Sequence, residues 1–256
     1  MGKPDPFTAL FWNVWVESQQ TAKRLQQLKT RFDTIITTYQ PHTFGLNEVL
    51  ADNKGKSSLL QHLESQGYHT FFAPFSPERN GVYSGSALAT RTAPLLVQFH
   101  ELGPDKYGAV RGFPGHTIKL IQAQVQHGGK QVNIVVNYLA HLVPWNWKTH
   151  IGHHKAFRNV VNLPDLQTTT IIGGDFNQFK FMPHMWGAKS MYHRATGTVL
   201  HPTWRLIGKF PIIQANYDNI FWTKCGTLTL DEFKVLGRHP SDHTPLVARF
   251  RLSSGE

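Results

Sequence analysis

The sequence predicts an α/β or α+β sandwich, in which β-sheets pack against each other and helices cover the outside. Three observations support this fold class. Apolar stretches of strand length outnumber amphipathic helical stretches, two of the strands form a hairpin, and the helical stretches occur at intervals along the chain. The 256 residues contain no internal repeat, low-complexity tract or linker, so a single domain over residues 1–256 is expected.

The first ninety residues predict four strands and two helices. Apolar residues at steps of three and four predict a helix over 17–40, which Pro41 ends. A shorter helix is predicted over 57–66, stopped by Gly67. Strands are expected over 7–16, 43–46, 68–73 and 86–90, with a loop over 74–83.

The rest of the chain is predicted to be richer in strands. Residues 116–126 and 131–137 predict a hairpin around His127-Gly128-Gly129-Lys130, and 148–162 predict a helix. Further strands are expected over 169–174, 218–222, 228–236 and 246–252. Residues 178–211 are predicted to be a long segment rich in loops.

Composition favours a polyanionic partner. Lys and Arg number 26 against 16 Asp and Glu, a formal net charge of +10, which suits nucleic acid or, alternatively, an anionic membrane surface. Cys225 is the only cysteine, so neither an internal disulfide nor a disulfide-linked partner is expected. No signal peptide and no apolar run of about 18 residues is visible. A cytoplasmic monomer is therefore expected, with a trimmed secreted form as the alternative.

Polar side chains follow several predicted strands at the point where each strand ends. Asp175 and Asn177 come directly after an apolar strand and two glycines, and their spacing of two points both side chains to the same side. The other polar residues at strand ends are Asn13, Glu48, His141, Asp242 and His243, with Asp218 at the start of a strand. Each has an ordinary explanation as a turn former, cap or buried histidine, but together they indicate a functional site.

These segments, in this order, resemble the endonuclease/exonuclease/phosphatase superfamily, whose DNase I-like fold is shared by DNase I, AP endonucleases and neutral sphingomyelinases. The matching pieces are Phe11-Trp12-Asn13, Leu46-Asn47-Glu48-Val49, residues 84–91, Val135-Val136-Asn137 leading to His141, Gly173-Gly174-Asp175-Phe176-Asn177, residues 217–221, and Ser241-Asp242-His243. The resemblance covers nearly the whole chain. It implies a four-layered α/β sandwich, with two mixed β-sheets packed face to face and flanked by helices.

The resemblance also implies a role for each polar residue. Glu48 would be the main ligand of a Mg²⁺ or Mn²⁺ ion, with Asn13 and Asp242 near it. Asp175 and Asn177 would hold the attacking water and the scissile phosphate. His243, paired with Asp218, would contact the phosphate or act as general base. His141 would be the second histidine of the site, which donates to a phosphate oxygen or assists the leaving group. Hard cations and oxygen ligands suit phosphoryl chemistry.

The sequence departs from the family pattern at several positions. Asn47 stands where the family usually has Gln, and Trp15 stands where AP endonucleases often have an acid, which weakens the case for a second metal and for an AP endonuclease. In DNase I an acid partners the histidine that matches His141. This acid has no evident counterpart here, and Glu78 is the one candidate. The paired cysteines of secreted DNases are absent.

Basic and aromatic residues outside these segments are candidates for substrate contacts. Arg194, Arg205, Lys209 and Arg238 are expected to contact phosphates, although a solvated surface also explains each of them. Trp145 and Trp147 could stack on bases, enter a membrane or simply pack within a loop. The histidines 150, 153 and 154 share one helical face, and are interpreted as a basic, partly solvated face or, with His141, as a metal site.

The predicted function is a divalent-metal-dependent phosphodiesterase that acts on DNA or RNA. A phospholipid, sphingomyelin or inositol-phosphate hydrolase on the same fold is the alternative. A catalytically inactive nucleic-acid-binding module is the third hypothesis, and the intact set of polar residues at the strand ends argues against it.

Overall fold

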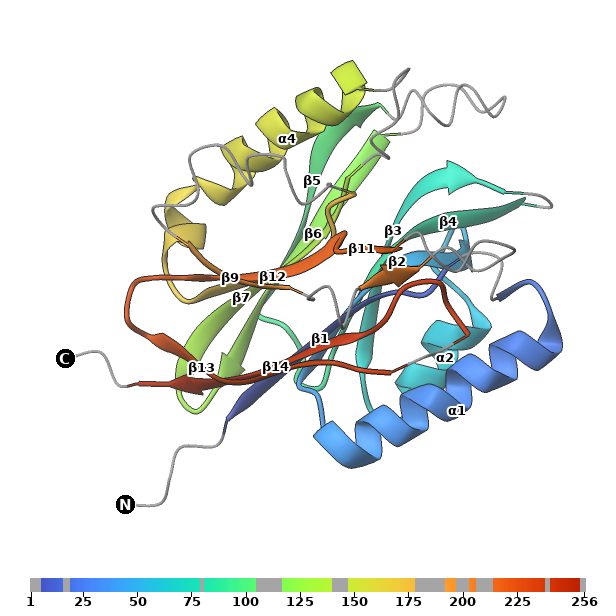
Figure 1. The fold of residues 1–256 in the computed structure, drawn as a ribbon, viewed down its shortest axis with the longest axis horizontal. Coiled ribbons are helices and arrows are strands. Elements are labelled where there is room, and N and C mark those ends of the chain that lie inside the picture. Colours follow the sequence, from blue (N-terminus) through green and yellow to red (C-terminus); the bar gives the residue numbers. More distant parts are fainter. Residues whose placement is uncertain are drawn as a thin grey trace.

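Two six-stranded mixed β-sheets form the centre of the computed structural model (Figure 1). The structure describes residues 6–15, 19–78, 81–104, 117–139, 147–177, 192–196, 203–205, 214–237 and 240–253. The first sheet has the order β13 (Leu228–Val235), β14 (Leu246–Leu252), β1 (Phe7–Asn13), β2 (Thr43–Asp52), β4 (Val82–Thr90), β3 (His69–Pro77). The second has the order β5 (Leu96–Pro104), β6 (Thr117–His127), β7 (Lys130–Tyr138), β8 (Thr170–Asp175), β12 (Asp218–Thr223), β9 (Tyr192–Thr196).

The remaining described elements are three α-helices, one 3₁₀ helix and a short pair of strands. They are α1 (Ala22–Tyr39), α2 (Ser58–Ser65), α4 (Trp147–Val161), η3 (Pro164–Gln167), and the antiparallel pair β10 (Trp204–Arg205) and β11 (Gln214–Ala215). Among these described helices, none is both long and apolar enough to span a membrane.

Each sheet is built around one parallel pair of strands. β1 pairs in parallel with β2, and β7 pairs in parallel with β8, whereas the other described strand pairs are antiparallel. A parallel pair needs a crossover connection, and α1 and α4 lie in these two crossovers. In each of these two pairs, both strands therefore have their C-terminal ends at the same edge of the sheet.

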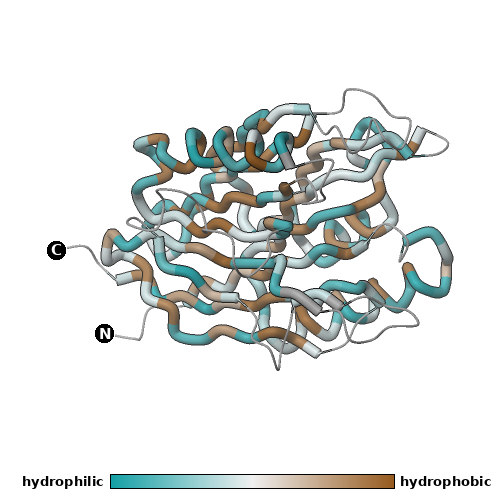
Figure 2. The backbone as a smooth tube through the Cα atoms, turned by 45° about the horizontal axis from the view of Figure 1, so that its top comes forward, coloured by the Kyte–Doolittle hydropathy of each residue, from teal (hydrophilic) through white to brown (hydrophobic). Residues whose placement is uncertain are grey.

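Three apolar clusters hold the layers together. One fills the space between the sheets, the second joins the first sheet to α1 and α2, and the third joins the second sheet to α4. Hydrophobic and hydrophilic residues alternate along many strands, as expected for faces that differ in environment (Figure 2). The order helix, sheet, sheet, helix confirms the four-layered sandwich.

The sheets approach closely where Phe11 of β1 lies between two glycines. A Cβ atom at Gly45 of β2 or at Gly173 of β8 would collide with the Phe11 ring. Phe11 is fully buried, and Gly173 is the first glycine of the motif that leads to Asp175. This packing sets the separation between the strands that carry the polar residues.

Several predicted boundaries were wrong. The strand predicted over 7–16 ends at Asn13, and the first helix begins at Ala22, after Thr21 caps it by accepting a bond from the Arg24 amide. β3 runs through Pro74 to Pro77, within the predicted loop 74–83. Proline is tolerated there because β3 is the edge strand of its sheet.

Two strands of the second sheet were not predicted. β5 and β9 are its edge strands, and most of their side chains are exposed or half-buried. An edge strand with mixed exposure lacks the alternation of apolar and polar residues by which strands are recognised.

Candidate active site

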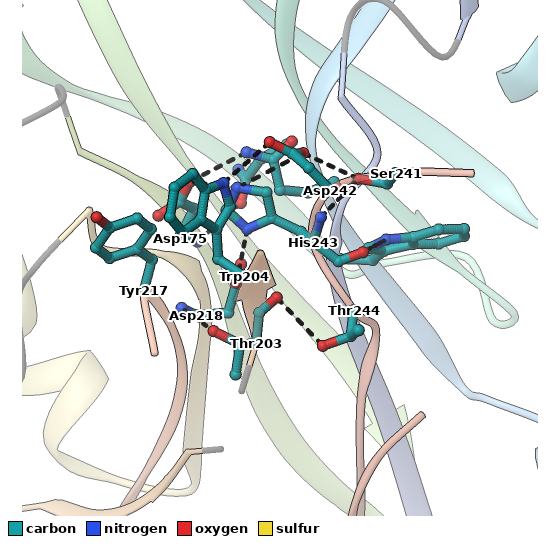
Figure 3. Close-up of polar contacts among 12 residues, drawn as sticks. Asp175, Thr203, Trp204, Tyr217, Asp218, Ser241, Asp242, His243 and Thr244 are labelled. Atoms are coloured by element: carbon teal, nitrogen blue, oxygen red, sulfur yellow. Dashed lines mark hydrogen bonds and ion pairs between the residues drawn. The ribbon is translucent and has the colours of Figure 1, made fainter. Parts of the chain in front are cut away.

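The ends of the central strands bring four carboxylates and one histidine together. Asn13 ends β1, Glu48 lies within β2, Asp175 ends β8, Asp218 begins β12, and Asp242 and His243 lie between β13 and β14. Asp218 is directly opposite Asp175 in the register of β12 and β8. Figure 3 shows that the side chains of Asp175, Asp218, Asp242 and His243 converge.

Glu48 was predicted to lie at the end of a strand, but it occupies a bulge within β2. The pairing of β2 with β4 shifts register between Leu46 and Val49, and Glu48 has a φ of 57°, in the left-handed region. The Gln19 side chain holds this bulge, because its Nε2 donates to the Glu48 carbonyl at 2.7 Å and its Oε1 accepts from the Leu50 amide at 2.9 Å.

Asn13 connects two of the carboxylates. Its Nδ2 donates to Glu48 Oε1 and to Asp175 Oδ2, both at 3.0 Å, and its Oδ1 accepts from the Trp15 amide at 3.0 Å. Asn13 is fully buried. In this arrangement the amide orients Glu48 and Asp175 toward the same space, while its oxygen faces the backbone.

The Asp175–Asn177 segment forms the turn that its sequence suggested. Asp175 Oδ1 accepts from the Asn177 amide at 2.8 Å, and Asn177 Nδ2 donates to the Leu139 carbonyl at 2.7 Å. Behind the turn, Asn47 Oδ1 accepts from the Asp175 amide at 3.0 Å. The turn therefore uses one oxygen of Asp175 and leaves Oδ2 toward Asn13 and His243.

Asp218 and His243 form a buried pair. His243 Nδ1 lies 2.7 Å from Asp218 Oδ2, and both side chains are almost fully buried. With Nδ1 engaged, Nε2 points to the other carboxylates, 3.8 Å from Asp175 Oδ2 and 4.0 Å from Asp242 Oδ1. The carboxylate of Asp218 fixes the orientation of the imidazole.

The electrostatics of the site follow from crowding acids around one base. Burial lowers the pKa of His243, but the charges of Asp218 and Asp175 outweigh it and raise this pKa to about 10. Burial raises the pKa of Asp175 to about 7, and the charge of His243 offsets part of that effect. Burial also raises the pKa of Asp242, with His243 opposing and Glu48 adding to the shift. The site therefore contains more acidic groups than basic ones among its described residues.

The donor set fits a hard divalent cation. Ligand atoms of Asp175, Asp218 and His243 lie within 4.8 Å of one another in the described part of the chain. Most of the surrounding donors are carboxylate oxygens, which Mg²⁺ and Mn²⁺ prefer, and a cation would neutralise the excess negative charge. Glu48 shares the Asn13 amide with Asp175, and Asp242 Oδ1 lies 4.0 Å from His243 Nε2, so both of these carboxylates border the group, in which Asp218 already binds Nδ1 of His243.

Sequence reasoning assigned no role to several residues at the site. Tyr138 Oη lies 3.4 Å from Glu48 Oε1, and Ser241 Oγ donates to the Asn13 carbonyl at 2.7 Å and accepts from the His243 amide at 3.0 Å. Thr203 and Trp204 contact Asp218 and Asp242 (Figure 3). These last two lie in the segment predicted to be rich in loops, where no periodicity marks a strand.

Arg194, a predicted phosphate contact, lies on β9 and is engaged within the sheet. Its Nε donates to Asn219 Oδ1 at 2.6 Å, and its guanidinium lies 5.9 Å from the centre of the Phe221 ring. Burial lowers the pKa of Arg194 to about 10.

The other predicted contacts lie largely outside the described residues. His141, Trp145, Lys209 and Arg238 belong to segments that are not described, and so do the side chains of Trp147 and Arg205. Glu78 is described, but its predicted partner His141 is not.

The interpretation of the α4 histidines as a partly solvated basic face was wrong. His150 and His153 are buried, with His153 Nε2 3.2 Å from the Pro104 carbonyl of β5. His154 Nε2 lies 3.0 Å from His150 Nε2, and burial, followed by the charges of His150 and His153, lowers the pKa of His154 to about 3. The cluster packs α4 against β5.

Solved structures with this fold cover almost the whole chain. The human Nocturnin catalytic domain with bound sulfate anion has a TM-score of 0.70 at 19% identity, covering 98% of this chain and 94% of that one. An endonuclease/exonuclease/phosphatase from Beutenbergia cavernae has a TM-score of 0.71 at 18% identity, covering 96% and 72%. D. rerio TDP2 complexed with single strand DNA product has a TM-score of 0.68 at 15% identity, covering 96% and 99%.

Sequence comparison gives the family. No curated protein sequence gives a significant match to the chain. The profile of the Endonuclease/Exonuclease/phosphatase family, however, matches residues 10–243, a range that begins just before Asn13 and ends on His243. The chain therefore belongs to the endonuclease/exonuclease/phosphatase family, with its DNase I-like fold.

Proposed function

We propose that this protein is a divalent-metal-dependent phosphodiesterase that hydrolyses nucleic acid. The observation that carries the proposal is the convergence of Glu48, Asp175 and Asp242 on the buried Asp218–His243 pair. Burying several acids and a histidine together lowers the stability of a fold, so such a cluster usually serves a charged ligand or a reaction.

The partner class is supported by charge and by the relatives. The formal net charge is +10, although the site itself carries excess negative charge. D. rerio TDP2 was solved with a single strand DNA product, and human Nocturnin with a sulfate anion, which has the tetrahedral shape of a phosphate. A basic chain around an acidic, metal-compatible centre suits a polyanion whose scissile phosphate meets a cation.

The bound cation would act as a Lewis acid on a phosphoryl oxygen. Glu48 and Asp242 would hold it, with Asn13 keeping Glu48 and Asp175 in place. Burial raises the pKa of Asp175, which suits a group that takes a proton from the attacking water. Water then adds to phosphorus as the ester P–O bond breaks, leaving a phosphomonoester and an alcohol.

His243 would bind the phosphate in its cationic form. With Nδ1 held 2.7 Å from Asp218 Oδ2, the protonated imidazole would donate through Nδ1 to Asp218 and through Nε2 to a non-bridging oxygen. In this proposal His243 contacts the phosphate and Asp175 is the general base.

A substrate panel tests the proposal. Plasmid DNA, single strands, RNA, an abasic duplex, sphingomyelin vesicles and an inositol phosphate would each be incubated with Mg²⁺, Mn²⁺ or EDTA. We expect cleavage of a nucleic acid with either cation and none in EDTA. Turnover of the lipid or the inositol phosphate alone would replace nucleic acid by the alternative substrate class, and undiminished cleavage in EDTA would reject metal dependence.

Glu48→Gln should lower turnover by on the order of a hundredfold or more, because it removes a charge that anchors the Lewis acid. Glu101→Gln is the matched control, since Glu101 is an exposed glutamate on β5 whose ion pair within the described residues is with Lys119, at 3.4 Å. Equal rates for the two variants would exclude Glu48 from the mechanism.

A further inference from the structure

A tryptophan holds one of the site carboxylates. Trp204 Nε1 donates to Asp242 Oδ2 at 2.9 Å, from a strand 38 residues earlier in the chain (Figure 3). The indole N–H is only a donor, and a bond from it to a carboxylate is charge-assisted. The bond therefore fixes which oxygen of Asp242 faces Trp204 and which faces the site.

The two oxygens of Asp242 have different surroundings as a result. Oδ2 is taken by Trp204, whereas Oδ1 lies 3.5 Å from Ser241 Oγ and 4.0 Å from His243 Nε2. A carboxylate on a short side chain would otherwise rotate between several orientations, because the contacts of its second oxygen to Ser241 and His243, at 3.5 and 4.0 Å, are long.

The segment that carries Trp204 is tied to the other members of the site. Thr203 Oγ1 accepts from the Asp218 amide at 3.1 Å, and the Thr203 carbonyl accepts from the Thr244 amide at 2.8 Å. Trp204 also forms an isolated β-bridge with His243. A displacement of Thr203–Trp204 would thus alter contacts to Asp218, Asp242 and His243 at the same time.

The indole ring itself is held in place. It packs against Tyr217, with ring centres 5.1 Å apart and planes at 41°, and Tyr217 directly precedes Asp218. With the ring fixed by this contact and the backbone fixed by the bridge, the N–H direction is fixed before any ligand binds.

We propose that Trp204 is a positioning residue, whose indole N–H pre-orients Asp242 so that Oδ1 is presented to the catalytic cation. This inference rests on the proposed function, in which Asp242 holds that cation. Trp204 acts through Asp242, and loss of the N–H leaves the carboxylate present but free to turn. Groups that orient metal ligands in this way are worth about 10- to 100-fold in metal affinity.

The test is Trp204→Phe, which keeps an aromatic ring against Tyr217 and removes the donor. We expect Mn²⁺ affinity, measured by calorimetry without substrate, to fall about tenfold or more. Trp222→Phe is the matched control, because Trp222 of β12 packs against Phe250 of β14 in the apolar cluster between the sheets. This variant should bind Mn²⁺ like the unaltered protein. If Trp204→Phe impairs folding, replacing Trp204 by β-benzothienylalanine keeps the size of the indole and replaces its N–H by sulfur.

A double-mutant cycle separates this role from simple packing. In an Asp242→Ala background, Trp204→Phe should cause no further loss of Mn²⁺ affinity, because its target is gone. Equal affinity of Trp204→Phe and the unaltered protein, or an additional loss in the Asp242→Ala background, would overturn the inference while leaving the proposed function standing. An unaltered protein that neither binds Mn²⁺ nor cleaves any substrate would overturn both.

Discussion

At the scale of single residues, the site concentrates features that are unfavourable elsewhere in a protein. Trp15, Glu48 and Asn177 have positive φ values of 57°, 57° and 48°, which side chains other than glycine rarely adopt. All three lie beside the converging carboxylates, where backbone strain of this kind is typical of functional sites. Among the described residues of the site, His243 is the buried base, and its cationic form stabilises these acids.

The titration of His243 gives a prediction for stability without metal. The pKa of His243 is near 6.5 in the unfolded chain and about 10 in the folded one, so its contribution is complete below about pH 6.5 and is lost as the pH rises toward 10. In EDTA, the free energy of unfolding by urea should therefore decline from about pH 6.5 to about pH 9.5 more steeply for the unaltered protein than for His243→Gln. Parallel curves would show that His243 has no raised pKa.

At the scale of elements, the sequence predicted which polar residues lie near strand ends, but not the bulges and short strands that hold some of them. Asp175, Asn177 and Asp218 were expected at strand ends and lie there. Glu48 was expected after a short strand, but β2 continues past it, because a bulge is held by Gln19, a residue 29 positions away. The role of Trp204 was missed because its strand, β10, is two residues long and shows no periodicity by which a strand could be recognised.

Gly174 shows how tightly the β8 edge is built. Its φ is 133°, and an added Cβ would collide with the Asn137 carbonyl and lie 2.9 Å from Asn47 Oδ1. Glycine is therefore required between β7 and the Asp175 turn. By contrast, Gly152 lies in α4 with open space around its Cβ position.

These two glycines make a paired prediction. Gly174→Ala should lower the free energy of unfolding by more than about 2 kcal/mol, because it adds backbone strain and a clash with the Asn137 carbonyl. Gly152→Ala should raise it by about 0.5–1 kcal/mol, because alanine favours the helix. Chemical denaturation of both variants measures the two changes, and a neutral Gly174→Ala would mean that the β8 edge can move to accommodate a side chain.

At the scale of the whole molecule, charge is divided between the site and the rest of the chain. The formal net charge is +10, while the buried site contains more acids than bases. The proposed substrate would be attracted by the basic chain, and its scissile phosphate would be accepted only with a cation. If the proposed function holds, the salt dependence of binding and the metal dependence of cleavage should be separate properties that different residues control.

The salt dependence of DNA binding gives the last prediction. If four to six phosphates are contacted, raising salt from about 50 to about 200 mM should weaken binding by roughly two to three powers of ten, at about −0.9 in log–log slope per phosphate. Reversing charge at Arg205, Lys209 and Arg238 should flatten this slope, whereas reversing the exposed Lys23, Lys155 and Lys224 lowers the net charge equally, from +10 to +4, and should leave it nearly unchanged. Hydrolysis of a small phosphodiester, which reaches only the metal centre, should be the same in both triple variants. Equal flattening in the two would assign binding to net charge alone, and a flat response of the unaltered protein would argue for an uncharged substrate surface.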